Sequence, residues 1–200
     1  RGAEGEGVGT SLKHFAVNNQ ETLRMSVSAE VDERALHELY LRPFEIAVKE
    51  GAPSTVMCSY NRINGVYASE NRMLLTRILR EQWGFDGLVM SDWGAVYRRP
   101  AGVAAGLDLE MPSSGGVTDR EIVRAVRAGR LDEAALDALC ARVLRLALAH
   151  APQRKKAYPA PVHHVAAVRR MLDRHHALAV RAARESAVLL KNEGRVLPLA

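Results

Sequence analysis

The sequence has few cysteines, few aromatic residues and no long apolar run, and each shortage excludes a class of protein. Cys58 and Cys140 are the only cysteines among 200 residues, too few for a disulfide scaffold or a four-ligand zinc site. Their scarcity favours a reducing compartment, so a cytoplasmic location is favoured over a secreted one. Apolar runs such as residues 144–149 are far shorter than the roughly 20 residues of a membrane helix. We therefore expect a soluble protein with no membrane partner.

The start of the chain lacks an initiator methionine and the basic and apolar regions of a signal peptide. We therefore expect a piece of a longer protein. Hydrophobic residues make up 48% of the chain, which is enough to form a core. The sequence carries no signal of oligomeric state.

Positive charge is concentrated in the second part of the chain. Residues 1–112 contain 12 basic and 15 acidic residues, whereas residues 113–200 contain 16 and 8. The basic residues recur at helical spacing beside Ala and Leu, which is typical of a solvated helix face. This face comprises Arg124, Arg127, Arg130, Arg142 and Arg145. We therefore infer no nucleic-acid partner.

Short apolar runs alternate with amphipathic stretches in the first 130 residues. Residues 10–17, 54–60, 87–92 and 106–111 are predicted to be buried strands. Helices are predicted over 32–51, with an interruption at Pro43, over 71–82, and over 118–129, where Thr118 and Glu121 form a capping box. This order predicts an α/β fold of parallel β/α units. The chain is long enough for half of an eight-stranded barrel, or for an open doubly wound sheet.

Beyond Gly129 the sequence predicts only helices and a linker. A helix over 131–150 begins at Asp132, and its apolar side is formed by Leu136, Leu139, Val143 and Leu144. Residues 151–162, rich in Pro and basic residues, read as a linker. A last helix is predicted over 163–191, and residues 196–200 suit the start of another strand.

Polar side chains gather where the predicted strands end. Lys13 and His14 close the first strand, Tyr60 follows the second, and Asp92 follows the third. Because the carboxyl ends of parallel strands open on one face, these groups are expected to share a pocket. Mixed donors and acceptors beside the aromatic face of Trp93 suit a polyhydroxylated substrate.

Each of these residues also has a purely structural interpretation. Lys13 would be an ion-pair partner, Asp92 would cap a turn at Gly94, and Trp93 and Met57 would pack in the core. Glu21 and Arg24 are expected to form an ion pair that supports their loop. Asp108 and Glu110 are either a second carboxylate pair or partners of arginines and backbone groups.

Several motifs resemble those of glycoside hydrolase family 3, the β-glucosidases. These are KHFAVNNQE at 13–21, MCSYN at 57–61, and GFDG at 84–87 leading to SDWG at 91–94. The segment from 105 to 112 is similar to the last barrel strand of the family. ESAVLLKN at 185–192, with LPL at 197–199, is similar to the entry to its second, α/β sandwich domain.

The resemblance implies a partial β/α barrel of parallel strands, its second half, followed by helices leading into a missing α/β sandwich domain. On this basis residues 1–150 are the barrel half, 151–162 the linker and 163–200 the entry to the second domain. Asp92 matches the family's nucleophile, and a nearby Lys13 would favour its charged form. Lys13, His14 and Tyr60 would hold sugar hydroxyls or the nucleophile, while Met57 and Trp93 would line the wall. No metal or cofactor is implied.

The implied reaction is retaining hydrolysis of a terminal β-linked glucose from a glycoside or oligosaccharide. The family's acid/base Glu would lie outside the chain, so the isolated piece is expected to be inactive. Residues 16–21 lack the His-containing loop of the N-acetylglucosaminidase branch, which favours the glucosidase branch. Alternatives are a xylosidase or arabinosidase of the same family, a non-catalytic sugar-binding relative, and a Schiff-base barrel aldolase using Lys13.

Overall fold

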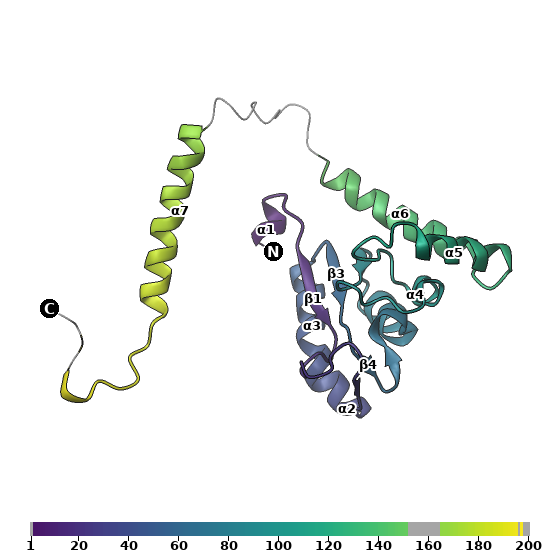
Figure 1. Cartoon of the computed structure of the whole chain (residues 1–200), viewed down its shortest axis with the longest axis horizontal. Coiled ribbons are helices and arrows are strands. Elements are labelled where there is room, and N and C mark those ends of the chain that lie inside the picture. Colours follow the sequence, from purple (N-terminus) through teal and green to yellow (C-terminus); the bar gives the residue numbers. More distant parts are fainter. Residues whose placement is uncertain (1, 152–164, 196, 198–200) are drawn as a thin grey trace. The chain divides into compact units, whose positions relative to one another are not determined.

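A computed structural model describes residues 2–151, 165–195 and 197. The chain divides into two compact units, Arg1–Ala151 and Pro152–Ala200. The first unit is a mixed α/β structure built on a small parallel sheet, and the second contains one long helix (Figure 1).

The sheet of the first unit consists of β1 (Ser11–Phe15), β3 (Thr55–Cys58) and β6 (Leu88–Met90), hydrogen-bonded in that order and all parallel. An isolated parallel bridge joins Met90 to Leu109. The strands therefore follow one another across the sheet in sequence order, and their carboxyl ends lie on the same side. The three predicted strands are confirmed, each shorter than expected.

The fourth predicted strand, 106–111, is reduced to the single bridge at Leu109. Helix α4 (Arg99–Ala105) ends at Gly106, whose φ of 105° turns the chain toward β6. The backbone N–H of Val89 then donates to the Asp108 carboxylate at 2.8 Å rather than to a carbonyl. A side chain thus replaces one bond of the ladder, and a regular strand does not form.

One continuous helical segment connects β1 to β3. It contains α2 (Glu33–Ala35), a π-helical turn, α3 (Arg42–Ile46) and a second π-helical turn that ends at Gly51. The change predicted at Pro43 is present as the start of α3, where Pro43 lies in the first turn and its missing N–H costs little, but no non-helical residue separates the two stretches. The Asp32 carboxylate caps the segment by accepting from the N–H of Ala35 at 2.9 Å.

A second helical segment, Met73–Gln82, connects β3 to β6. Its buried face is the predicted one: Leu74, Leu75, Ile78 and Leu79. These side chains pack with Phe15 and Val56 of the sheet in the main core of the unit.

Helices α4, α5 (Val117–Arg127) and α6 (Glu133–Ala149) share a second apolar cluster. Its buried members are Val103, Ile122, Ala125, Leu131 and Leu139. Asp132 caps α6 as predicted, accepting from the N–H of Ala134 at 3.0 Å. Leu144 was expected on the packed side of α6, but its side chain is 61% exposed.

The predicted capping box at Thr118 is wrong. Helix α5 begins at Val117, with Gly116 at its N-cap. The Thr118 hydroxyl donates to the Glu110 carboxylate, and the N–H of Thr118 donates to the Ser114 hydroxyl. Because Thr118 lies inside the helix and both its groups are bonded to residues that precede it, it does not act as the N-cap.

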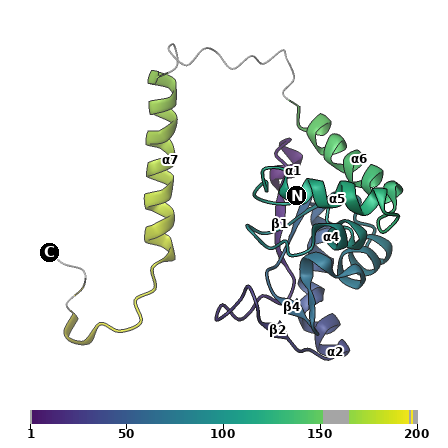
Figure 2. The ribbon, with the colours of Figure 1, turned by 45° about the vertical axis from the view of Figure 1, so that its right-hand side comes forward.

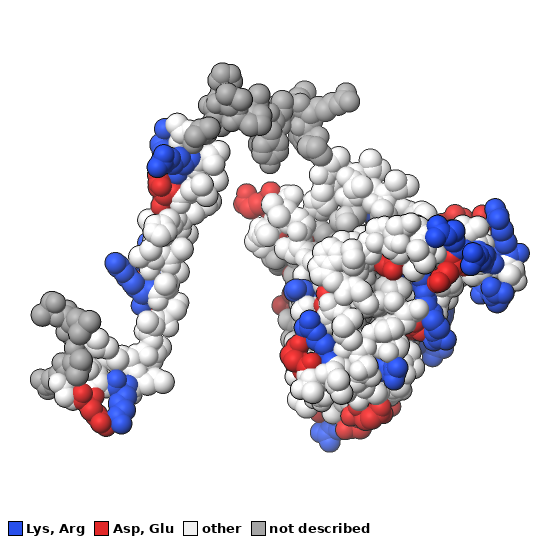
Figure 3. Space-filling model, in the orientation of Figure 1, with Lys and Arg blue, Asp and Glu red and all other residues white. Residues whose placement is uncertain are grey.

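Most of the predicted basic face is solvated. Lys and Arg side chains gather at the α5 end of the first unit (Figure 3), where Arg124, Arg127 and Arg130 are exposed. Arg142 departs from the prediction, since its guanidinium forms an ion pair of 2.7 Å with the buried Asp108.

A second small sheet was not predicted. It pairs β2 (Ser28–Ala29) with β4 (Arg62–Ile63) in parallel, and β4 with β5 (Val66–Tyr67) in antiparallel (Figure 2). The β4–β5 turn contains Asn64 and Gly65, with φ of 49° and 86°. Asn-Gly is a hairpin signal, so the sequence did carry a trace of this element.

The second unit contains α7 (Val165–Ser186), shorter than the predicted 163–191. The linker prediction over 151–162 and the strand prediction over 196–200 fall almost entirely outside the described residues. Of the helices in the described ranges, none combines the length and apolarity that crossing a membrane requires.

Candidate functional site

Three predicted site residues come from three neighbouring strands. His14 is the second-to-last residue of β1, Tyr60 lies two residues after β3, and Asp92 lies two residues after β6. All three positions are at the carboxyl ends of the parallel strands. The topology therefore brings together residues that are 32 positions or more apart in the chain, as with Tyr60 and Asp92.

The Asp92 carboxylate is the centre of this cluster and is only 6% exposed. Its Oδ1 accepts hydrogen bonds from the Tyr60 hydroxyl at 3.1 Å and from the backbone N–H of Trp93 at 2.7 Å. Its Oδ2 lies 3.2 Å from Nε2 of His14. Within the described ranges, no Lys or Arg nitrogen lies within 4.0 Å of this carboxylate.

The loop after β6 fixes Asp92 in place. The Ser91 hydroxyl accepts from the N–H of Met111 at 2.8 Å and donates to the carbonyl of Met111 at 3.2 Å. Gly94 has φ of 77°, and its N–H donates to the same carbonyl at 2.9 Å. The turn at Gly94 is therefore present as predicted. Hydrogen bonds to Met111 fix the chain on both sides of Asp92.

Tyr60 is positioned as a permanent donor. Burial first, and then its hydrogen bond to Asp92, raise the pKa of the Tyr60 phenol. The guanidinium of Arg24 lies 4.8 Å from the centre of the Tyr60 ring and forms an ion pair of 2.8 Å with Glu21. The predicted Glu21–Arg24 pair is thus confirmed, and it also braces the tyrosine.

Cys58 lies at the end of β3 but does not suit nucleophilic chemistry. Its side chain is fully buried, and burial raises the pKa of the thiol to about 12. A neutral, inaccessible thiol is a packing group.

The other three predicted site residues, Lys13, Met57 and Trp93, differ in how far their side chains are exposed. Lys13 is exposed. It was predicted to lie near Asp92, but the described residues include no ion pair between Lys13 and Asp92. Met57 is half-buried in β3. The Trp93 side chain is 57% exposed, so the interpretation of Trp93 as a core residue is wrong. The binding roles of all three stay predictions.

Asp108 and Glu110 act as partners of arginines. Asp108 forms ion pairs of 2.7 Å with both Arg80 and Arg142. Glu110 lies 3.9 Å from Arg99 and accepts from Thr118. The second carboxylate pair considered above is thus excluded, because both charges are already matched by structural contacts.

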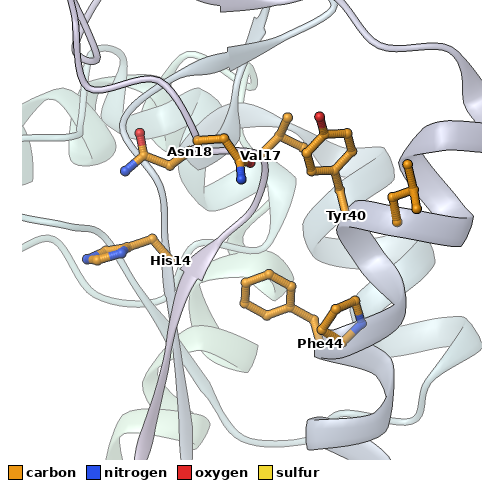
Figure 4. A pocket seen from close by; sticks show the side chains of 8 residues that line it. His14, Val17, Asn18, Tyr40 and Phe44 are labelled. Atoms are coloured by element: carbon orange, nitrogen blue, oxygen red, sulfur yellow. The ribbon is translucent and has the colours of Figure 1, made fainter. Parts of the chain in front are cut away.

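A pocket of about 250 Å³ adjoins His14 (Figure 4). Tyr40 and Phe44 approach it from the helical segment that follows β2, while Asn18 comes from the loop after β1. Oδ1 of Asn18 is buried and has no hydrogen-bond partner among the described residues. No sequence pattern indicated this pocket, because its walls come from separate elements.

The cluster can supply a carboxylate for nucleophilic or electrostatic chemistry. Asp92 is largely removed from water, and its carboxylate contacts a phenol, an amide and an imidazole. None of its described contacts is a guanidinium or ammonium group. Such a carboxylate can attack or stabilise an electron-poor carbon, provided that an acid elsewhere protonates the leaving group. No group of three or more metal-ligating side chains occurs among the described residues.

Comparison with known proteins gives a consistent set of matches. Residues 1–146 match the family model described as the glycosyl hydrolase family 3 N terminal domain. The thermostable β-glucosidase B of Acetivibrio thermocellus is 50% identical over 199 residues, covering 100% of this chain and 25% of the relative. An exo-α-(1→6)-L-arabinopyranosidase of Bifidobacterium longum is 48% identical over 198 residues, covering 99% and 25%.

Among solved structures, β-glucosidase 3B of Thermotoga neapolitana in complex with α-D-glucose matches with a TM-score of 0.85. That chain is 40% identical, and the match covers 100% of this chain and 28% of that one. The chain thus spans about a quarter of the length of the curated relatives it matches.

Proposed function

Because the chain belongs to glycoside hydrolase family 3, as a β-glucosidase-like hydrolase, we propose that it is part of a retaining exo-β-glucosidase in which Asp92 is the nucleophile. The observation that carries this proposal is the environment of Asp92. Its carboxylate is buried, aimed by Tyr60 and His14, and unmatched by a nearby arginine or lysine among the described contacts.

The domain organisation is part of the proposal. Residues 1–150 form the second half of a β/α barrel, 151–162 a linker, and 163–200 the entry to an α/β sandwich domain. The unbroken sequence order of the parallel strands supports a singly wound barrel over a doubly wound sheet, since the latter reverses its order. The division of the chain at Ala151 supports the linker.

In the proposed reaction, an oxygen of Asp92 attacks the anomeric carbon as the bond to the leaving-group oxygen breaks. The leaving group takes a proton from an acid outside these residues, and a glycosyl ester of Asp92 remains. Water then attacks the same carbon, gives its proton to the conjugate base, and releases Asp92 and the sugar. Tyr60 and His14 keep the attacking carboxylate in one orientation throughout.

The substrate proposed is a β-glycoside or oligosaccharide with a terminal glucose. Lys13 and His14 would bind hydroxyls, while Met57 and Trp93 would form the wall beside the ring. The identity to the Bifidobacterium longum arabinopyranosidase favours an arabinosidase as the second candidate. The exposure of Lys13 argues against the aldolase alternative, because a Schiff-base lysine needs a desolvated amine.

The test is covalent trapping in the complete enzyme with a 2-deoxy-2-fluoro β-glucoside carrying a good leaving group. The fluorine slows hydrolysis of the ester, so we expect the peptide containing Asp92 to carry the sugar. Asp92→Asn should lower kcat by roughly 10³-fold or more. Asp86→Asn is the matched control, since the side chain of Asp86 is 91% exposed. A label on another residue, or normal turnover by Asp92→Asn, would refute the proposal.

A further inference from the structure

Glu70 is a buried carboxylate that the proposed reaction does not use. It ends a short helical turn, Ala68–Glu70, that follows β5. Its side chain is only 3% exposed, although that of its ion-pair partner Arg98 is 77% exposed. Burying a carboxylate costs free energy unless hydrogen bonds replace those to water. Among the described residues, all of the hydrogen-bond partners of Glu70 belong to Arg98.

One of these partners is a backbone group. Oε1 of Glu70 accepts from the backbone N–H of Arg98 at 2.8 Å. Oε2 accepts from Nε of the Arg98 side chain at 2.9 Å and from its Nη2 at 2.5 Å. A bond to a guanidinium joins two side chains, which can move together, whereas a bond to a backbone N–H fixes the position of the main chain. Glu70 therefore anchors the backbone at Arg98.

Arg98 is the last residue of the loop that carries Asp92. This loop begins after β6, and Arg98 is the N-cap of α4. Between them, the N–H of the buried Ala95 donates to the carbonyl of Asp92 at 3.1 Å. The other end of the loop is fixed by the hydrogen bonds between Ser91 and Met111. A hydrogen-bonded turn thus connects Asp92 to a stretch of chain whose far end is held by a single buried side chain.

The element that carries Glu70 is held firmly on both sides. Ser69 is 1% exposed, and its carbonyl oxygen lies 3.2 Å from the position that a Cβ would take at Gly102 of α4. The Asn71 side chain accepts from the N–H of Leu74 at 3.0 Å, which ties it to the helical segment that follows. Both neighbours of Glu70 thus belong to the packed part of the unit. A side chain supported in this way can hold a functional loop in one position.

We propose that Glu70 is a positioning residue for the nucleophile, acting through the backbone of Arg98 on the loop that carries Asp92. The inference rests on the proposed function, in which Asp92 must meet the anomeric carbon in one orientation. A misplacement of about 1 Å can lower a rate by roughly 10²-fold. No hydrogen bond or ion pair among the described residues joins Glu70 to the Asp92 carboxylate itself. Its effect is therefore on how fast Asp92 attacks rather than on how tightly a sugar binds.

Helix α4 has a second attachment, so the loss of Glu70 should leave the helix in place. The guanidinium of Arg99 donates to the carbonyls of Leu107 at 3.0 Å and Asp108 at 2.8 Å. Removing the Glu70 carboxylate should thus release the end of the loop without detaching α4. The consequence can be measured in folded enzyme.

The experiment measures how fast the complete enzyme forms the 2-deoxy-2-fluoroglucosyl ester on Asp92. Glu70→Ala should lower the rate constant of labelling at saturating reagent by roughly tenfold, while the inhibition constant of free glucose changes less than about twofold. Glu70→Gln keeps an oxygen for the Arg98 N–H and should retain most of the rate. Glu70→Asp keeps the charge but is one methylene shorter, so it should behave like Glu70→Ala. Should Glu70→Ala fail to fold, Glu70→Asp carries the same comparison.

Two further variants separate the backbone anchor from the ion pair. Arg98→Ala removes the guanidinium but keeps the N–H, and should lower the labelling rate by no more than about twofold, because an exposed guanidinium contributes little to an ion pair. Glu81→Ala, at an exposed position of the helical segment Met73–Gln82, is the matched control for the loss of a glutamate.

The labelled fraction reports how much enzyme is folded, whereas the rate constant reports on the folded molecules alone. A lower labelled fraction with an unchanged rate constant, in either Glu70→Ala or Glu70→Asp, would make Glu70 a stabilising residue only and overturn the inference. Equal losses of rate in Arg98→Ala and Glu70→Ala would also overturn it, because the ion pair would then be responsible. Absence of a label on Asp92 in the unaltered enzyme would instead overturn the proposed function.

Discussion

Asp92 and Asp108 are two buried aspartates next to β6, one after its carboxyl end and one beside Val89, and they differ in what surrounds them. Asp108 is 1% exposed and receives the guanidinium groups of Arg80 and Arg142, with the N–H of Val89 as its third partner. Asp92 is 6% exposed and receives a phenol, an imidazole and a backbone amide. Both carboxylates have hydrogen-bond partners, but only Asp108 has strong positive charges beside it.

This difference separates a structural carboxylate from a reactive one. A charge matched by two arginines has little tendency to interact with anything else, and its removal leaves two partly buried cations without this partner. Asp92 is held by donors that orient it without cancelling its charge. Perturbed or unmatched ionisable groups of this kind mark functional sites.

Arg80 extends the structural side of the comparison. Its guanidinium also donates to the carbonyls of Gly87 at 3.0 Å and Gly106 at 3.3 Å. Burial lowers the pKa of Arg80, which the charge of Asp108 opposes. The Asp108 network thus fixes the segments on both sides of β6, the strand that leads to Asp92.

The largest effect on stability is expected at Asp108. Asp108→Asn should lower the free energy of unfolding by about 3 kcal/mol, because it leaves two partly buried guanidinium groups without a counter-charge. Asp92→Asn, the matched substitution, should change it by less than about 1 kcal/mol, since the donors around it keep an acceptor. Denaturant unfolding of the complete protein measures both. Equal losses for the two variants would contradict the distinction drawn between them.

A smaller effect is expected when one donor of Asp92 is removed. Tyr60→Phe should lower kcat/KM roughly tenfold, which corresponds to a hydrogen bond to a charged group worth about 1.4 kcal/mol. Arg24→Gln, which keeps the phenol but removes the guanidinium over its ring, should lower it less. Steady-state kinetics on a β-glucoside measures kcat/KM for both variants. A larger loss in the Arg24 variant would show that the guanidinium over the Tyr60 ring matters more than the Tyr60 hydroxyl.

The smallest effect concerns a third carboxylate, Glu4, which accepts hydrogen bonds from Thr10 and Ser54 at the amino ends of β1 and β3. Hydrogen bonds, first that from the Thr10 hydroxyl, lower the pKa of Glu4 from 4.5 to about 2. A lowered pKa in the folded state adds stability above pH 4.5, which is lost as the pH falls toward 2. Glu4→Gln should therefore show a shallower fall of melting temperature over this range. An unchanged acid slope would mean that other carboxylates govern it.

Local patterns predicted the parts of the fold that depend on local physics. Alternating and continuous apolar runs located β1, β3 and β6, and the apolar face of Met73–Gln82 was correct to the residue. The errors came where a distant group decided the outcome. Thr118 is engaged by Glu110, Arg142 is drawn to Asp108, and the ladder of the fourth strand is replaced by a carboxylate.

For the candidate site, the motifs identified Asp92, His14 and Tyr60, and the strand ends predicted that they would meet. The sequence could not predict which side chains contact Asp92. That no arginine or lysine lies beside it among the described residues depends on how the chain folds. The hydrogen bond from the Tyr97 hydroxyl to the Met25 carbonyl was missed for a similar reason, since the two residues are 72 positions apart in the chain.

The sequence by itself determined the three strands of the main sheet, the longer helices and the polar groups at the strand ends, because hydrophobic periodicity and turn chemistry act over a few neighbouring residues. Only the tertiary structure decided that one buried aspartate meets two arginines and the other meets none within 4.0 Å among its described contacts. Those partners lie 28 and 34 residues from Asp108 along the chain, so their choice follows from how the helices pack on the sheet.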